Sequence, residues 1–273
     1  MLAAIAHIEP LERRRHLSVS TTLLSSGVLI VSGTKQADDI TVQLAPLGIV
    51  TVTSGGEDVY TNETSHDSIS GISIIGGNGN DTITVGDNEG VGVTINGNKG
   101  NDTIVTTSVR AIGAMVDAGA GDDHVDVSNS IGPGNGDGSL ILGGDGNDII
   151  HSANALGSHG STVRGGAGND VILFRSLEGA TEGHIAYGGD GDDGIHGGNL
   201  RDYLLGEAGK DRLIGANGDD VLIGGDGKDW LYGQAGDDFL DGYGGVDTIN
   251  GGLGTDTMVG DGTDVSKQIE LLL

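Results

Sequence analysis

Aspartate recurs at every ninth residue between Gly188 and Val259, and this repeated carboxylate is the feature of the sequence best suited to chemistry. The segment divides into blocks of nine that read GGDGDDGIH, GGNLRDYLL, GEAGKDRLI, GANGDDVLI, GGDGKDWLY, GQAGDDFLD, GYGGVDTIN and GGLGTDTMV. The sixth residue of every block is an aspartate: Asp193, Asp202, Asp211, Asp220, Asp229, Asp238, Asp247 and Asp256. Carboxylates and carbonyls from glycine-rich turns are hard oxygen ligands, which suit Ca²⁺. The spacing therefore predicts a series of calcium sites.

The same block occurs earlier in the chain at wider intervals. Intact copies begin at Gly76, Gly97, Ala118, Gly143 and Gly165, and their sixth residues are Asp81, Asp102, Asp123, Asp148 and Asp170. Glycines at positions one, two and four permit positive φ and close approach of backbones, so the first six residues should form a tight turn. Position four is glycine in every copy except at Leu200. We expect its backbone to join the aspartate at the metal, at Gly79, Gly100, Gly121, Gly146, Gly168, Gly191, Gly209, Gly218, Gly227, Gly236 and Gly245.

The elements that must position these turns are short strands. The last three residues of each block form a minimal strand whose middle, apolar side chain points inward. Two blocks make one 18-residue coil in the C-terminal half, whereas one block and one plain turn make coils of ~22 residues in the N-terminal half. Apolar residues then stack in two ladders, from Ile74 to Met258 and from Ile83 to Ile249. The pattern predicts an all-β fold, a right-handed parallel β-helix or β-roll solenoid.

These repeats resemble the RTX, or haemolysin-type, calcium-binding nonapeptide family. The resemblance implies a parallel β-roll with one Ca²⁺ between successive stacked turns. It also implies export from a bacterium, with the protein secreted or held at the cell surface. Because metal binding accounts for every regularly placed aspartate, we expect a structural module rather than an enzyme.

Stacking sets the expected number of ions. One column of turns runs from Gly76 to Gly242 and a second from Gly197 to Gly251, and their gaps would hold roughly eleven ions. Asp229 lies between Asp211 and Asp247 in its column and should contact two of them. Carboxylates about 5 Å apart repel by ~3 kcal/mol at an effective dielectric near 20. The roll is therefore expected to fold on binding calcium.

The composition argues against several other functions. Acidic residues number 40 against 13 Lys and Arg, a net charge of −27, so nucleic acid is not an expected partner. No apolar run approaches the ~20 residues of a membrane-spanning helix. The chain has no cysteine for disulfide or thiol chemistry. Its eight histidines lack zinc-binding spacings and are expected at the surface or at strand ends.

Both ends of the chain differ from the repeats. Residues 1–26 resemble the LEPR-XLL sorting motif of some bacterial surface proteins, at Glu9 to Arg14 and Leu17 to Ser18. A disordered basic N-terminus is the alternative. The strands of a single solenoid are expected from Gly27 to residue 265, with contiguous repeats at 188–259. Residues 266–273 would then form a cap or a secretion tail.

Two other functions stay open. A calcium-dependent polysaccharide-binding module would need one row of exposed aromatic rings, for which the candidates are Tyr187, Tyr203, Trp230, Tyr232 and Tyr243. A polysaccharide lyase or epimerase would need an acid–base cluster apart from the regular aspartates, and the sequence shows none. Extracellular polysaccharide and cell-surface components are therefore the partners to consider besides calcium.

Overall fold

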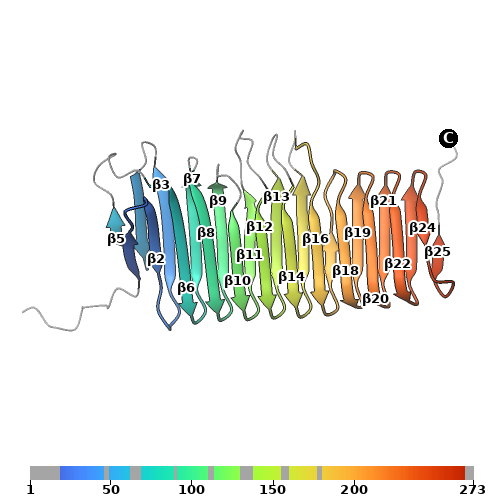
Figure 1. The fold of residues 1–273 in the computed structure, drawn as a ribbon, viewed down its shortest axis with the longest axis horizontal. Helices are drawn as coiled ribbons and strands as arrows, with labels where there is room; N and C mark the ends of the chain where they lie inside the picture. The colour runs from blue at the N-terminus through green and yellow to red at the C-terminus, as the bar shows by residue number, and fades with distance from the viewer. Residues whose placement is uncertain are drawn as a thin grey trace, which may run out of the picture.

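The chain winds into one elongated solenoid, with its N-terminal strands at one end and its C-terminal strands at the other (Figure 1). A computed structural model describes residues 19–45, 49–61, 69–88, 91–109, 114–129, 138–154, 160–176 and 180–267. No helix in these ranges is long and apolar enough to cross a membrane. The sorting-motif residues and most residues of the plain turns lie outside the described part of the chain.

Two sheets face each other along the solenoid, and each coil contributes one strand to each sheet. Twelve described strands form one sheet, in the spatial order β1 (Ser20–Leu23), β2 (Val28–Ser32), β6 (Gly71–Asn78), β8 (Gly92–Lys99), β10 (Met115–Ala120), β12 (Leu140–Asp145), β14 (Thr162–Ala167), β16 (Ile185–Asp190), β18 (Tyr203–Gly209), β20 (Val221–Gly227), β22 (Phe239–Gly245) and β24 (Thr257–Val259). Thirteen form the other, in the order β25 (Val265–Lys267), β23 (Thr248–Leu253), β21 (Trp230–Ala235), β19 (Arg212–Asn217), β17 (Gly194–His196), β15 (Val171–Ser176), β13 (Ile149–Asn154), β11 (His124–Asn129), β9 (Thr103–Val109), β7 (Thr82–Asn88), β3 (Asp39–Ala45), β4 (Ile49–Ser54) and β5 (Glu57–Thr61). Both sheets continue across Gly188 without interruption.

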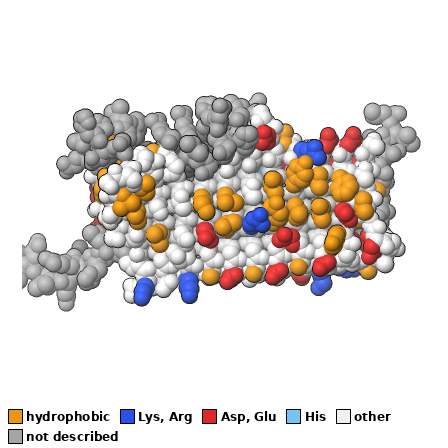
Figure 2. Space-filling view, viewed as in Figure 1, with side chains coloured by type: hydrophobic (Ala, Val, Ile, Leu, Met, Phe, Trp, Pro, Cys, Tyr) orange, Lys and Arg blue, Asp and Glu red, His pale blue; other side chains and the backbone are white. Residues whose placement is uncertain are grey.

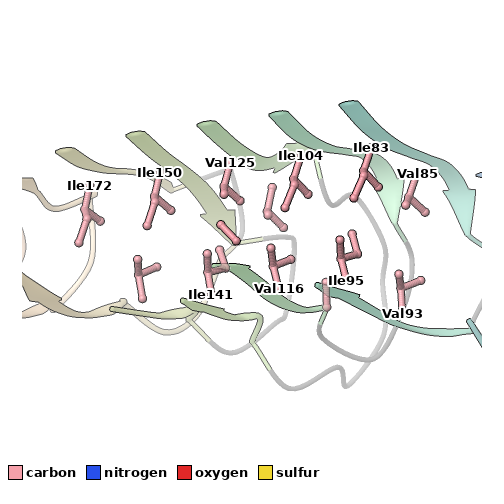
Figure 3. Packing of buried hydrophobic residues seen from close by; sticks show 14 of the residues in the cluster. Ile83, Val85, Val93, Ile95, Ile104, Val116, Val125, Ile141, Ile150 and Ile172 are labelled. Carbon is pink, nitrogen blue, oxygen red and sulfur yellow. The ribbon is translucent and has the colours of Figure 1, made fainter. Parts of the chain in front are cut away.

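The core consists of the two predicted ladders, which are confirmed residue by residue. In the 12-stranded sheet, parallel pairing aligns Ile74, Ile95, Val116, Ile141, Val163, Ala186, Leu204, Leu222, Leu240 and Met258. In the 13-stranded sheet it aligns Ile83, Ile104, Val125, Ile150, Ile172, Ile195, Leu213, Leu231 and Ile249. All except the half-buried Met258 are fully or almost fully buried. Figure 3 shows side chains of the two ladders pointing toward one another across the narrow interior.

Coil length changes along the chain as predicted. Equivalent aspartates in successive coils are 21, 21, 25, 22 and 23 residues apart from Asp81 to Asp193. From Asp193 to Asp247 the interval is 18 residues. The longer coils also bury apolar residues outside the two ladders, among them Val85 and Phe174. The interior is therefore wider in the N-terminal half.

The N-terminal end differs from the expected parallel coils. The first strand, β1, begins at Ser20, before Gly27, and pairs antiparallel with β2. Strands β3, β4 and β5 form an antiparallel meander rather than a coil. Gly55 and Gly56 join β4 to β5 with φ values of 57° and 82°, and two consecutive positive φ values suit a tight two-residue hairpin. The meander forms the N-terminal edge of the 13-stranded sheet, with the short strand β5 outermost.

A ladder residue should contribute far more stability than an exposed apolar residue. We predict that Leu222→Ala lowers the free energy of unfolding by about 2–5 kcal/mol, because Leu222 is fully buried between Leu204 and Leu240. The control is Val246→Ala, at a residue 52 % exposed, which should change it by about 0.5 kcal/mol or less. Urea denaturation in saturating Ca²⁺ measures both values. Equal effects would contradict the assignment of the ladder as the core.

Candidate metal centre

The glycines of each repeat have different roles in the turn. Position-four glycines adopt positive φ, for example 125° at Gly100 and 145° at Gly236. A Cβ at Gly100 would also overlap the carbonyl of Gly79, the position-four glycine of the preceding coil. Position two also has positive φ but accepts other residues, such as Ala216 with φ 82°. Only Gly fits position four, because its φ of 111° to 157° lies beyond the 66° to 82° that other residues adopt at position two.

Position one is glycine in every intact repeat except at Ala118, and none of its glycines has positive φ, so space and not φ favours glycine there. A Cβ at Gly76 would lie 2.6 Å from Oδ2 of Asp81 and 2.9 Å from the carbonyl oxygen of Gly97 in the next coil. The same pair of oxygens, from the turn's own aspartate and from the next coil, borders position one throughout both columns wherever another repeat follows. The absence of a side chain there keeps a space between coils that is lined by oxygen atoms.

The predicted aspartates of the first column form one continuous buried ladder. Each backbone N–H of an aspartate donates a hydrogen bond to Oδ1 of the aspartate in the next coil, at N···O distances of 2.7 to 2.9 Å. The ladder runs through Asp38, Asp81, Asp102, Asp123, Asp148, Asp170, Asp193, Asp211, Asp229, Asp247 and Asp264. Every coil is thus joined to the next by a carboxylate as well as by its strands.

The other carboxylate oxygen is left without a donor. Among the described residues, Oδ2 is buried and accepts no hydrogen bond in Asp81, Asp102, Asp123, Asp148, Asp170, Asp193, Asp211, Asp220, Asp229, Asp238, Asp247 and Asp256. A buried carboxylate oxygen without a partner is costly, so these positions fit a bound cation. Carboxylate and carbonyl oxygens are also the ligands that Ca²⁺ prefers. The residues present therefore fit the metal that the sequence predicts.

The two carboxylate oxygens of Asp229 have different surroundings. Asp229 was expected to contact two ions, one in each neighbouring gap. Its Oδ1 accepts the N–H of Asp211 at 2.9 Å, whereas its Oδ2 borders Gly224 on the side of the next coil. Oδ2 is thus the oxygen without a protein donor, whereas Oδ1 keeps one lone pair beside the N–H that it accepts, and contact of Asp229 with two ions stays a prediction.

Burial dominates the electrostatics of the columns. It raises the pKa of Asp123, Asp170 and Asp220 to about 7, and that of Asp193 and Asp211 to about 6. The backbone N–H on Oδ1 lowers each pKa in part, and neighbouring aspartates raise it again. The ladder hydrogen bond therefore does not compensate for burial of the charge, which requires either a proton or a cation.

An exposed ladder at position five runs in the opposite direction. Oδ1 of Asn80 accepts the N–H of Asn101 in the next coil at 3.0 Å, and the pattern continues to Lys210, which donates to Asp192. Position six accepts from the preceding coil, so each turn is bound on both sides. The nine-residue period of the aspartates did not predict this ladder, although Asn or Asp at position five in consecutive early repeats is a signal for it.

The second column begins with an exception at Asp202. Both of its carboxylate oxygens accept hydrogen bonds from backbone N–H groups, Oδ1 from His184 at 2.6 Å and Oδ2 from Gly198 at 2.5 Å. This is the turn in which Leu200 replaces the position-four glycine, and neither Leu200 nor Gly198 has positive φ. Because leucine is strained at positive φ, the turn adopts another conformation that closes on its own aspartate. The expected open ligand oxygen is therefore absent at Asp202.

Beyond Asp202 the second column follows the same rule as the first. Asp202, Asp220 and Asp238 each donate a backbone N–H to Oδ1 of the aspartate in the following coil, at 2.8 to 3.0 Å. Asp220 and Asp238 keep an unpartnered Oδ2 beside the carbonyl of the next position-one glycine. The structure thus brings these predicted residues together as expected.

His184, which was expected at the surface or at a strand end, lies directly before β16, so the strand-end alternative is confirmed. It is fully buried and occupies the aspartate slot in the coil before Asp202, where its Nδ1 accepts the N–H of Ser161 at 3.1 Å. Its ring stacks on Phe174 with centroids 4.1 Å apart. Burial lowers the pKa of His184 to about 4, so the ring is neutral near pH 7. The imidazole continues the hydrogen-bond ladder without a buried charge.

Two further aspartates extend the first column beyond the predicted ligand set. Asp38 lies at the N-terminal end, in the degenerate repeat beginning at Gly33, and its Oδ2 accepts hydrogen bonds from the N–H and Oγ1 of Thr34. Asp264 lies at the C-terminal end and accepts the N–H of Asp247 at 2.9 Å. It is 17 residues from Asp247 instead of 18, so the nine-residue period did not reveal it.

No three His, Cys, Asp or Glu side chains converge on one point anywhere in the described ranges. Each gap between turns instead combines an aspartate oxygen with backbone carbonyls. A donor set of this kind lacks the nitrogen and sulfur ligands that Zn²⁺ takes in structural sites. The chemistry of the gaps accordingly favours Ca²⁺ over Zn²⁺.

Removal of calcium should make stability depend on pH in a defined direction. An aspartate whose pKa is raised in the folded state stabilises the fold below the unfolded pKa near 3.8, and this contribution is lost as pH rises through the folded pKa. We therefore predict that the free energy of unfolding of the metal-free protein falls between about pH 4 and pH 7. Circular dichroism of the calcium-stripped protein over this pH range measures it, with urea denaturation at each pH at which the protein is folded. A flat or rising profile over this range would contradict the buried-carboxylate geometry.

Comparison with protein families identifies the repeats. The model of the RTX calcium-binding nonapeptide repeat, which spans four copies, matches residues 73–89, 93–107, 157–173, 187–222, 196–230 and 223–258. No curated protein matches the chain. The turns of Asp123 and Asp148 lie outside the matched segments but occupy the same column with the same hydrogen bonds. The repeats of this chain are therefore RTX calcium-binding nonapeptide repeats, carried on a parallel β-solenoid.

Proposed function

We propose that the protein is an extracellular structural module whose solenoid folds when the stacked turns bind Ca²⁺. The observation that carries the proposal is the unpartnered, buried Oδ2 in successive coils of both columns. A solenoid coil contacts only its neighbours, so a buried charge in each coil weakens every interface along the column. Binding of a divalent cation between coils removes that penalty and adds its binding free energy to folding.

The calcium requirement suits a protein that acts outside the cell. Free Ca²⁺ is on the order of millimolar outside cells and far lower inside them, whereas calcium sites in extracellular modules have Kd values of about 10⁻⁴ to 10⁻³ M. A chain with a net charge of −27 and few bound cations is expanded by self-repulsion, a state compatible with passage through an export channel. Export followed by calcium-driven folding is the route that these properties support.

The candidate aromatic residues do not favour a polysaccharide-binding module. Tyr187, Tyr203 and Tyr243 belong to the 12-stranded sheet, whereas Trp230 and Tyr232 belong to the 13-stranded sheet. They therefore cannot form the single row of stacking rings that binding along a polysaccharide chain requires.

The distribution of perturbed carboxyl groups does not favour an enzyme either. Within the described residues, every aspartate with a raised pKa belongs to one of the two columns. Candidate catalytic acids and bases are recognised by perturbed pKa values that structural interactions do not explain. Here the column geometry explains each of them.

A matched pair of substitutions tests calcium-coupled folding. Asp193→Asn keeps an oxygen for the N–H of Asp170 but replaces the unpartnered Oδ2 with an amide nitrogen. We predict that it raises the Ca²⁺ concentration at the midpoint of folding by about tenfold or more, equivalent to about 1.4 kcal/mol. The adjacent Asp192→Asn should change the midpoint by less than about twofold, because Asp192 is exposed and Asn169 occupies the equivalent position.

Circular dichroism during Ca²⁺ titration of the EDTA-treated protein gives the midpoint for each variant. Wild-type protein in excess EDTA should show much less β-structure than in Ca²⁺. The proposal fails if EDTA leaves the spectrum unchanged, or if the two substitutions shift the midpoint equally.

The closed turn at Asp202 changes the expected stoichiometry. Since its Oδ2 is already bonded to Gly198, we revise the number of ions to about ten. Leu200→Gly restores the glycine that positive φ requires, and we predict that it adds one ion per chain. Leu200→Ala is the control, because it removes most of the side chain but not the strain of positive φ. Elemental analysis after exhaustive dialysis measures the count, and equal calcium in all three proteins would contradict this account of the turn.

A further inference from the structure

A notch lies on the outer face of the 12-stranded sheet between β18, β20 and β22. At position two of three successive coils, Glu207 aligns with Gly225 and Gly225 aligns with Tyr243. The glycine has no side chain, so the two flanking residues border an open depression of about 260 Å³, lined by Leu205, Glu207, Ile223, Gly225, Asp226 and Tyr243. Figure 2 shows that hydrophobic side chains gather on this half of the solenoid, with acidic side chains among and beside them.

The lining has three distinct parts. Leu205 and Ile223 are half-buried and form an apolar floor, and the ring of Tyr243, which is 67 % exposed, forms a wall. Glu207 and Asp226 are exposed acidic residues at the rim, and neither has an ion-pair partner in the described part of the chain. A ligand that fills this notch should combine an apolar stem with a positively charged end.

Other aromatic rings on this solenoid already have an arginine or lysine side chain of the same chain over the ring. Arg164 lies over Tyr187 at 4.2 Å, Arg201 over Tyr203 at 5.2 Å and Arg212 over Tyr232 at 5.4 Å. Lys228 lies over Trp230 at 5.9 Å from the ring centroid. Among the described Tyr and Trp residues from Tyr187 onward, Tyr243 alone has no basic side chain over its ring. In the notch, the ring of Tyr243 is therefore exposed without the basic side chain that covers the other rings.

We propose that this notch binds an arginine side chain of a partner polypeptide. The methylene groups would cover Leu205 and Ile223, the guanidinium would stack on Tyr243, and its N–H groups would donate to Glu207 and Asp226. The depression is smaller than the roughly 300–1,000 Å³ typical of small-molecule sites, so its size suits one side chain. The net charge of −27 further attracts a basic partner.

The test uses the full chain in saturating Ca²⁺, with acetyl-Gly-Arg-Gly-amide as the probe. The same tripeptide with citrulline is the control, because citrulline has nearly the shape of arginine without its charge. Methyl NMR spectra should show shifts at Leu205 and Ile223, and affinity at least tenfold higher for the arginine peptide. Equal binding of the citrulline peptide, or no shifts at these methyl groups, would overturn the proposal.

Variants locate the site. The double substitution Glu207→Gln with Asp226→Asn, and separately Tyr243→Gly, should each weaken arginine-peptide binding at least tenfold. Tyr243→Gly should stay folded, because Gly225 and Gly252 occupy the same position in other coils and glycine suits the φ of 66° at Tyr243. Asp145→Asn, at position three of a distant coil, should leave binding unchanged. An equal loss of affinity in this variant would mean that the net charge of the protein, and not the notch, determines binding, and would overturn the proposal.

Two other occupants would replace an arginine-bearing partner. Stronger shifts of the same methyl groups by cellobiose than by the arginine peptide, at equal concentration, would assign the notch to a sugar. Sedimentation velocity tests for a second copy of the chain. Self-association that the Glu207→Gln, Asp226→Asn variant abolishes would assign the notch to that copy. Either result would overturn the proposal as stated.

Discussion

The hydrogen bond from each aspartate N–H to Oδ1 of the next aspartate is the interaction on which the rest of the structure depends. It places one carboxylate at every coil interface and fixes where coils of different length, 21 to 25 residues or 18, come into register. The same bond uses only one oxygen. The other oxygen is buried without a donor, and burial raises the pKa of the group. The contact that holds the coils in register thus also creates the need for a cation between them.

The repeat sequence follows from this geometry, position by position. Position four requires glycine because its φ is positive and a Cβ would overlap the preceding coil. Position one is glycine except at Ala118, because a Cβ there takes up space beside the carboxylate. Position two tolerates Glu207 or Tyr243 because its side chain points outward. The turn at Leu200 shows what happens when position four is not glycine. A single side chain at position four changes the turn, and Asp202 then satisfies both oxygens with backbone N–H groups.

The ladders of the core could be predicted residue by residue because each ladder residue lies at a fixed offset from a repeat, even where the coils differ in length. Features without that offset were missed or wrong. The antiparallel meander depends on a Gly55–Gly56 hairpin between two short strands, a local signal independent of the repeat. Asp264 ends a turn that is one residue short, and His184 replaces an aspartate with a residue of another type. Oδ1 accepts a backbone N–H whereas Oδ2 has no donor, and this difference depends on side-chain geometry, which sequence spacing alone does not determine.

The two halves of the solenoid differ in how much apolar surface they bury and in how many aspartate columns they contain. In the longer N-terminal coils, residues such as Ile72, Val85 and Val127 widen the apolar interior, and the described coils have one aspartate column. In the 18-residue coils each strand buries little more than its one ladder residue, and a second carboxylate column replaces the lost apolar area. The neutral ring of His184, stacked on Phe174, lies where the longer coils give way to the 18-residue coils. With calcium-coupled folding as proposed above, we expect stabilisation to pass from apolar burial to metal binding along the chain, so that the C-terminal coils depend most on calcium.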